Sequence, residues 1–576
     1  MNDIRRTILW VIFGFSMVLL WDQWQIYNGK KATFFPGPAQ STAAVPVGSV
    51  PGKLSGETGV PHSATSVPPV VDGLPGAATV SAVPAVPKLR FDVTTDVLKL
   101  TFDSEGGSLV RAEFLKHSDM VDKSRNFVLL DDSKERIYQA QSGVVAGATG
   151  GAFPTHKTPM TVSGARSLAD GENEIVLQFT SPDVGGVKLV KTYTLRRGAY
   201  DIAVKHTLTN TSAVPIAPQV YLQLIRDGNK PAGESSFYST FTGPAVYTEA
   251  KKYQKVEFKD IKSKKAEFEK TANNGYVSMV QHYFASAWLL PDGVERTYSL
   301  DAVDIGAEMA DCCYRATMVA PLAAIDPGAS KSIDAILFAG PQEEKKLEAL
   351  AKGLELVKDY GWLTILAKPL YWLLDQLHRV IQNWGWSIVA LVLLLKIAFY
   401  WLNAKAYASM AKMKAVNPKI MEMRERLKDN PQQMQQEMMR IYREEKVNPM
   451  GGCFPIMIQI PVFIALYWVL LSSVEMRNAP WIMWIRDLSS PDPYFILPIV
   501  MTLTTLLQTA LNPAPPDPMQ AKMMWFMPLI FSVMFFFFPA GLVLYWITNN
   551  ILSIAQQWII NTRMGVPPQF NLPKFK

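Results

Sequence analysis

The chain has 576 residues, of which 49% are hydrophobic, and a formal net charge of +7. This length predicts more than one domain. The modest positive charge is of the size that cytoplasmic anchoring of membrane segments produces, and no nucleic-acid-binding motif accompanies it. Two of the three cysteines are adjacent, so we expect no disulfide framework, and no CxxC or histidine-rich cluster predicts a metal or cofactor. These features exclude the commonest metal-dependent and nucleic-acid-binding classes.

The first 27 residues are typical of a membrane anchor. Arg5 and Arg6 precede the apolar run 8–21, as in a signal peptide. No small-x-small cleavage site follows, and aromatic residues instead form an interfacial belt: Trp21, Trp24 and Tyr27. We therefore predict an uncleaved anchor helix over 1–27 with a cytoplasmic N-terminus; a cleaved signal peptide is the alternative. Residues 28–88 are rich in Pro and Ala and predict a flexible tether.

Residues 89–341 show the pattern of a β-domain. Alternation and β-branched residues predict strands in many short segments, including 97–102, 175–180, 188–195, 201–208 and 219–225. Strands without interleaved helices predict an antiparallel β-sandwich. Its histidines form no catalytic constellation, so we interpret them as surface or core residues and do not expect an enzyme: His117, His156, His206 and His282.

Residues 342–382 form a helical linker in this interpretation. An apolar stripe predicts one helix over 342–358. A second helix, over 362–382, is amphipathic and stands just before a long apolar segment. We interpret it as lying in the membrane interface; a buried helix of the soluble domain is the alternative.

The core, 383–562, is predicted to cross the membrane five times. Its apolar segments are 383–402, 453–473, 494–511, 523–538 and 542–560. With the anchor this gives six spans. Basic residues are dense in 403–450 and present in the tail 563–576, but sparse in the loop 474–493. The positive-inside rule therefore predicts two cytoplasmic termini and a sandwich on the outer side, which in a double-membrane bacterium is the periplasm.

Segment 403–450 is basic and rich in methionine. Asn417-Pro418 and Asn430-Pro431 each resemble an N-cap followed by proline at the first helical position. Two apolar stripes flank the turn near residue 430. We therefore predict a cytoplasmic helical hairpin, with these stripe residues facing each other: Ile420, Met423, Leu427, Met434, Met438 and Ile441.

Several motifs resemble the YidC family, which includes the bacterial, mitochondrial and chloroplast membrane insertases. They are DYGWL at 359–363, NWGWS at 383–387, YASMAKMK at 407–414, KVNPMGGCFPIMIQIPVF at 446–463 and FPAGLVLYW at 538–546. The layout also matches: anchor, periplasmic domain, interfacial helix and a five-span core with a cytoplasmic hairpin. The match is weaker in the tether and much of the sandwich.

The resemblance implies a membrane protein insertase and chaperone of the bacterial inner membrane, without nucleotide or metal. Its implied substrates are nascent inner-membrane proteins. The implied partners are the Sec translocon with its accessory subunits, membrane lipids, and the ribosome and signal-recognition targeting machinery, which would meet the hairpin. The family groove is hydrophilic, open to the cytoplasm and lipid, and closed to the periplasm. It usually carries an arginine where this chain has Lys396.

Lys396 is the charged residue inside the first core span, about 9 Å from its cytoplasmic end. Such a charge faces a wet cavity or snorkels to the interface. No acidic residue lies inside a core span, which argues against a proton-coupled transporter. We predict a substrate groove lined by Lys396, Gln459, Thr505, Gln508, Tyr545, Trp546 and Asn549. A channel or transporter, and a membrane-anchored carbohydrate-binding domain, remain as alternative functions.

Overall fold

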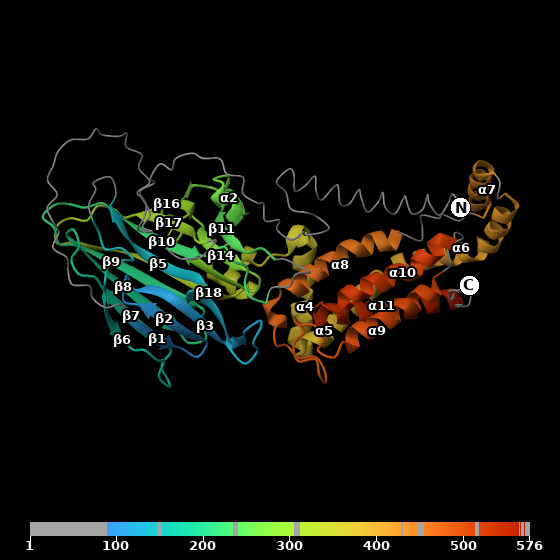
Figure 1. Cartoon of the computed structure of the whole chain (residues 1–576), viewed down its shortest axis with the longest axis horizontal. Coiled ribbons are helices and arrows are strands. Elements are labelled where there is room, and N and C mark those ends of the chain that lie inside the picture. Colours follow the sequence, from blue (N-terminus) through green and yellow to red (C-terminus); the bar gives the residue numbers. More distant parts are fainter. Residues whose placement is uncertain are drawn as a thin grey trace. The chain divides into compact units, whose positions relative to one another are not determined.

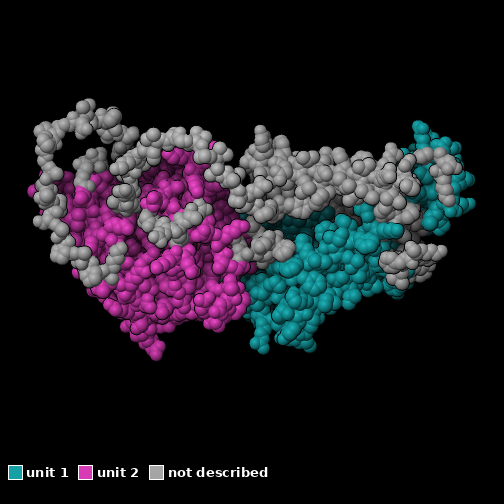
Figure 2. Space-filling model, viewed as in Figure 1, with its two compact units in different colours: residues 1–44, 359–576 teal, residues 45–358 magenta. Residues whose placement is uncertain are grey.

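The computed structural model describes residues 89–146, 152–233, 240–304, 312–427, 430–445, 454–512, 518–563, 565 and 570. Within its helices, the side chains of 362, 406, 410, 411, 413, 414, 417, 431, 454–459 and 518–521 are not described. The predicted anchor 1–27 and tether 28–88 lie outside these ranges, as does most of the tail. The chain divides into two compact units, a first unit of residues 45–358 (labelled unit 2 in Figure 2, magenta) and a second unit of residues 1–44 with 359–576 (labelled unit 1, teal).

The first unit is the predicted β-sandwich, built from two nine-stranded sheets (Figure 1). One sheet has the order β1-β2-β3-β4-β5-β10-β17-β16-β13, and the other β12-β11-β14-β15-β18-β9-β8-β7-β6. The strands are β1 (Arg90–Thr94), β2 (Leu98–Asp103), β3 (Ser108–Ser118), β4 (Asn126–Asp132), β5 (Ile137–Ala146), β6 (Thr161–Gly164), β7 (Glu174–Thr180), β8 (Val187–Arg196), β9 (Asp201–Asn210), β10 (Pro218–Arg226), β11 (Gly243–Thr248), β12 (Lys252–Lys255), β13 (Thr271–Ala272), β14 (Tyr276–Gln281), β15 (Phe284–Leu289), β16 (Arg296–Ala302), β17 (Tyr314–Pro321) and β18 (Ser330–Pro341). A short helix, α2 (Phe258–Lys262), follows β12. The five strands named from the sequence are confirmed.

Aromatic side chains join the inner faces of the two sheets. Phe102 of β2 meets Tyr193 of β8 edge to face at 5.1 Å between ring centroids. Phe114 of β3 lies 5.2 Å from Phe284 of β15. Buried residues of β9, such as Ile202 and His206, alternate with more exposed ones. This explains the alternation in the sequence, because successive side chains of a strand point to opposite faces of the sheet. The sandwich core therefore lies between the sheets.

A polar cluster is buried within this apolar core. The Lys191 ammonium donates to the Gly106 and Ser142 carbonyls, both at 2.6 Å. The His206 ring bonds the Ser142 hydroxyl at 2.8 Å, and the His156 ring bonds Tyr221 at 2.6 Å. Burial lowers the pKa of Lys191 to about 7 and, with help from nearby cations, the pKa values of both histidines to about 3. The histidines are thus neutral core residues, as interpreted from the sequence.

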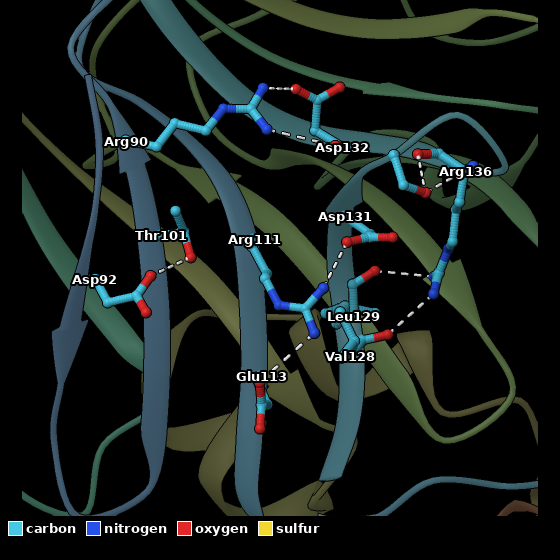
Figure 3. A network of polar contacts seen from close by, with 11 residues as sticks. Arg90, Asp92, Thr101, Arg111, Glu113, Val128, Leu129, Asp131, Asp132 and Arg136 are labelled. Carbon is cyan, nitrogen blue, oxygen red and sulfur yellow. Dashed lines mark hydrogen bonds and ion pairs between the residues drawn. The ribbon is translucent and has the colours of Figure 1, made fainter. Parts of the chain in front are cut away.

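The outer face of β1–β4 carries a ladder of charged side chains (Figure 3). Arg111 bridges Asp131 at 2.7 Å and Glu113 at 3.6 Å, and Arg90 pairs with Asp132. Arg111 and Asp131 pair between the neighbouring strands β3 and β4, Arg111 and Glu113 lie on the same strand, and Arg90 reaches from β1 to Asp132 at the end of β4. Elsewhere in the domain Cys312 and Cys313 are joined by a disulfide, which differs from the expectation that adjacent cysteines stay unbridged.

The linker is more broken than predicted. The single helix expected over 342–358 is instead α3 (Glu344–Leu350) and a 3-10 turn, η1 (Leu354–Val357). Gly353 separates them with a φ of 79°, in the left-handed region that ends helices. Another 3-10 turn, η2 (Gly361–Leu363), leads into α4 (Thr364–Ile381), which is the predicted amphipathic helix.

The second unit is helical throughout its described residues, apart from loops (Figure 1). After α4 come α5 (Trp384–Ala398), α6 (Tyr400–Arg426), α7 (Pro431–Glu444), α8 (Phe454–Ser472), a 3-10 turn η4 (Val474–Met476), α9 (Ile496–Leu511), α10 (Pro518–Phe535) and α11 (Ala540–Arg563). Four of the five predicted spans each overlap a single helix, whereas the first, 383–402, is divided between α5 and α6. Judged by length and composition, none of the described helices suffices alone to cross a membrane, whereas Trp384–Ala398 and Tyr400–Ser409 meet the criterion jointly across a 62° bend.

The α6–α7 pair bears out one of the two predicted helix starts. Asn430 caps α7 by accepting from the Gln433 amide at 3.2 Å, with Pro431 at the first helical position. The predicted helix start at Asn417-Pro418 is wrong, because Pro418 lies inside the continuous helix α6. Both predicted stripes pack in one cluster with two further residues, Val416 and Tyr442.

Candidate functional site

Lys396 lies closer to a helix end than the sequence suggested. The expected span 383–402 is interrupted at Phe399, so α5 ends at Ala398 and Lys396 occupies its last turn. The aromatic run that begins at Phe399 continues as α6 after the bend. A cation in the last turn of a helix interacts favourably with the free carbonyls there. The bend therefore gives the ammonium an electrostatic partner without an acidic residue.

The Lys396 ammonium contacts α11. It donates a hydrogen bond of 2.7 Å to the Ser553 hydroxyl, and Ser553 donates in turn to the Asn549 carbonyl at 2.6 Å. Tyr407 of α6 also hydrogen bonds to Ser553. Among the described residues Lys396 has no ion-pair partner. The site thus joins a positive charge to three neutral groups from α6 and α11.

A second polar contact extends this row along α11. The Asn403 amide of α6 donates to the Gln556 side chain at 3.4 Å. The Gln556 amide nitrogen is buried and has no hydrogen-bond partner among the described residues. A buried polar atom without a partner is costly, so such an atom is typical of a site that binds water or a ligand. Asn549, Ser553 and Gln556 recur at the spacing of one helix face.

A separate set of polar contacts links α11 to α9. The Asn550 side chain donates to Thr505 at 2.8 Å and to Thr504 at 3.2 Å. Both threonine hydroxyls donate to the Met501 carbonyl one turn earlier. These bonds use the Asn550 amide nitrogen and both threonine hydroxyls, and they join two helices. Thr505, predicted as a groove residue, is therefore engaged in helix packing.

Aromatic side chains fill the region where α8, α10 and α11 meet. Trp546 lies edge-on to Phe463, with ring centroids 4.7 Å apart, and 5.1 Å from Phe535. Tyr545 is buried and stacks on Phe463 at 5.9 Å. Trp546 is half-buried, whereas Tyr545 is buried. Of the two predicted aromatic residues, Trp546 is therefore the more accessible to a substrate.

The seven predicted site residues thus fall into distinct places. Lys396 contacts Ser553, which bonds the backbone carbonyl of Asn549; Thr505 joins Asn550, and Gln508 is half-buried on α9. The side chain of Gln459 lies outside those described. Ser553 and Gln556 lie within the predicted span 542–560 but are not among the seven predicted groove residues. The sequence prediction missed Asn403 and Tyr407, because both follow the predicted end of the span.

An ordered loop covers the other end of these helices. Residues 473–495 contact the N-terminal ends of α5 and α11: Asn383 donates to the Trp481 carbonyl at 3.2 Å, and the Gly541 amide to the Leu488 carbonyl at 2.9 Å. Asp492 is buried within the loop and accepts from Trp484 at 3.0 Å and from the Leu497 amide at 2.7 Å. Lys396 lies 12 residues from the start of α5, about 18 Å along its axis.

The sandwich has a cleft of about 600 Å³ on the outer face of the β11-to-β8 sheet. Lys205 of β9 and Asp334 of β18 stand opposite each other in register along one side. Tyr247 and Tyr276 on the other side stack on each other at 5.3 Å and are buried. Sugar-binding sites usually present an open aromatic face, which these two tyrosines do not offer.

Comparison with known proteins matches both units. The family model described as YidC periplasmic domain matches residues 90–373, and the one described as 60Kd inner membrane protein matches residues 376–566. The membrane protein insertase YidC of Cupriavidus necator is 52% identical over 563 residues, 98% of each chain. That of Ralstonia nicotianae is 53% identical over 566 residues, again 98% of each. The crystal structure of an active YidC insertase with its first transmembrane domain resolved is 19% identical, with a TM-score of 0.36 over 81% of this chain and 91% of that one.

Proposed function

The chain belongs to the YidC family of membrane protein insertases, and from this premise we propose that Lys396 and the polar row of α11 receive the hydrophilic part of an incoming segment. It inserts inner-membrane proteins, and its β-sandwich is the periplasmic domain of the family. The single observation that carries the proposal is the Lys396–Ser553 contact, a cation held among neutral polar groups between α5 and α11.

The predicted topology is part of the proposal. The anchor 1–27 and five core helices cross the membrane, with both termini and the α6–α7 pair in the cytoplasm. Two observations support it: basic residues concentrate in 403–450, and large apolar side chains are exposed on the core helices, among them Leu503 of α9 and Ile530 of α10. In water these side chains would be unfavourable, whereas lipid solvates them.

The mechanism follows from charge and burial. The Lys396 ammonium attracts acidic residues in the flank of a nascent segment. The Gln556 side-chain amide nitrogen, which has no hydrogen-bond partner among the described residues, would donate to the same flank. The flank rests in this polar groove while the apolar segment enters lipid. Burial of the apolar segment drives the process, at about 25 cal/mol per Å². No covalent bond changes, so the activity needs no catalytic residue.

Two further features support a short, one-sided passage. The loop 473–495 covers the N-terminal ends of α5 and α11, which would close the groove on the periplasmic side. Helix α9 has 16 residues, about 24 Å in length. A helix shorter than the hydrocarbon layer thins the bilayer around it. Thinning would lower the barrier for a polar tail.

Exposed surfaces of the second unit support the remaining proposed partners. Ile365, Trp372 and Val380 are exposed along α4, while Tyr371 on its other side bonds Glu475 at 2.6 Å. An apolar exposed stripe suits the membrane interface. The basic, methionine-rich α6–α7 pair would meet the ribosome and the signal-recognition machinery. We also propose that the protein works beside the Sec translocon and acts as a chaperone in the assembly of membrane proteins.

Site-specific photo-crosslinking tests the substrate path. A photoreactive residue at Trp546, whose ring is half-buried, should capture a ribosome-bound nascent membrane segment. The matched control is Tyr467, also half-buried, on α8, whose ring packs against Trp468 and Phe538. Capture at 546 but not at 467 supports a path beside α11. Equal capture at both positions, or none at 546, contradicts it.

Two other functions predict different outcomes. A channel or transporter would move a small solute in proteoliposomes, in a manner lost on Lys396→Ala. A carbohydrate-binding function would reside in the sandwich, but the stacked, buried tyrosines of its cleft do not favour it. Deleting residues 89–341 separates the two domains' roles. We predict that insertion persists in the deletion variant; loss of insertion at normal protein level would instead place the function in the sandwich.

A further inference from the structure

We propose that Ser553 is the positioning residue for Lys396: it holds the ammonium inside the groove and, being neutral, leaves the positive charge available to acidic substrate segments. This inference rests on the proposed function and adds a second residue to it.

The bonding of Ser553 supports this role. A serine hydroxyl has one hydrogen to donate and two lone pairs to accept with. The hydrogen goes to the Asn549 carbonyl at 2.6 Å, which fixes the hydroxyl. The hydroxyl oxygen then accepts from the Lys396 ammonium at 2.7 Å. The bond to the Asn549 carbonyl therefore holds this oxygen in place as an acceptor for the ammonium.

The lysine side chain needs such an acceptor. Its four-carbon stem is flexible, and a lysine two residues from a helix end can extend toward the headgroups. One short bond to a buried oxygen opposes this, since Ser553 is only 2% exposed. Without it the ammonium would have the α5 carbonyls as its remaining described attraction. Ser553 thus keeps the charge at the depth where substrate flanks would meet it.

A neutral acceptor has a consequence that an acidic one would not. An aspartate at this position would bind the ammonium more strongly, but it would cancel the charge that attracts the substrate. Hydrogen bonding to serine fixes the cation and leaves the local net charge at +1. Among the described residues of the core, none forms an ion pair with Lys396. The site is therefore built to hold a charge without neutralising it.

A double-mutant cycle tests the inference in the full chain, by pulse-chase insertion of two substrates that differ only in an acidic or neutral translocated tail. Ser553→Ala should slow insertion of the acidic-tail substrate about tenfold, because a hydrogen bond to a charged group is lost. Ser553→Thr, which keeps the hydroxyl, should retain the rate. Ser553→Asp should also slow the acidic tail, although it binds lysine. Ser553→Ala and Ser553→Asp should each slow the neutral-tail substrate much less than the acidic-tail substrate.

The control is Ser532→Ala on α10. Ser532 is buried and donates to the Pro528 carbonyl at 2.7 Å, the same one-turn bond that Ser553 makes. This variant should insert both substrates normally. If Ser532→Ala slows insertion as Ser553→Ala does, or if Ser553→Ala slows both tails alike, the effect is structural and the inference is wrong.

The cycle separates failure of the inference from failure of the proposed function. In a Lys396→Ala background, Ser553→Ala should have no further effect, because its partner is gone. If the two effects multiply instead, Ser553 acts independently and the inference is overturned while the role of Lys396 stands. If Lys396→Ala itself leaves the acidic tail unaffected, the proposed function fails.

Discussion

Two buried histidines should make the sandwich unstable in mild acid. His156 and His206 are neutral in the folded domain, because burial lowers their pKa values to about 3, whereas an unfolded histidine has a pKa near 6.5. Below pH 6.5 the unfolded chain therefore binds more protons than the folded chain. The stabilising contribution of each histidine is complete above pH 6.5 and is lost as the pH falls toward 3.

The magnitude follows from the size of the shift. Going from pH 7 to pH 5 should cost about 2 kcal/mol per histidine, at about 1.4 kcal/mol per pH unit below 6.5, and about 4 kcal/mol for both. Lys191 does not add to this loss. Its folded pKa of about 7 lies below the unfolded value, so its effect on stability varies above pH 7, where stability rises with pH up to about 10.5.

Amide hydrogen exchange of β9 and β10, measured in the full chain in detergent, reports the free energy of opening at each pH. His206→Gln should lose about half of the pH dependence, because a glutamine does not titrate. His206→Gln keeps an amide that can still bond Ser142. An opening free energy that is unchanged between pH 7 and pH 5, or an unaltered slope in the variant, would refute this explanation.

Two further substitutions test the packing. Asn550→Ala removes both hydrogen bonds that join α11 to Thr504 and Thr505. It should therefore destabilise the core by about 1 kcal/mol and lower the denaturation midpoint of the protein in detergent. A midpoint equal to that of the wild type would show that these bonds do not hold the helices together. Gly353→Ala should destabilise the sandwich by about 2 kcal/mol, since the new Cβ would lie 2.3 Å from the Tyr247 ring at a φ of 79°. Gly198→Ala is the control, because its φ of 71° is similar but nothing lies within 4 Å of the new Cβ. Equal effects at both glycines would mean that backbone strain alone, not the contact with Tyr247, sets the loss.

The fold was largely predictable because the hydrophobic periodicity of the sequence indicates most of its strands and helices. Alternation along β9 marked a half-buried strand, and the stripes around Met423 and Met438 marked two packed helices. The break at Phe399 was not predictable, because the apolar run continues through it without Gly or Pro. The prediction at Pro418 was wrong because proline is common at the first position of a helix, whereas Pro418 lies inside α6.

The candidate site was predictable in its charge but not in its partners. Lys396 was evident as a cation in an apolar segment. Its bond to Ser553 joins residues 157 positions apart, and no local pattern reports such a contact. Thr505 and Asn550 illustrate the same limit, since polar residues that line a groove and polar residues that join helices have the same composition.

The most direct measurement is the insertion of matched acidic-tail and neutral-tail substrates by cells that contain only the Lys396→Ala or the Lys396→Arg variant. Alanine removes the charge, whereas arginine keeps it. We predict that Lys396→Ala impairs insertion of the acidic tail alone and that Lys396→Arg supports both substrates. Normal insertion of the acidic tail by Lys396→Ala would contradict the role of this charge.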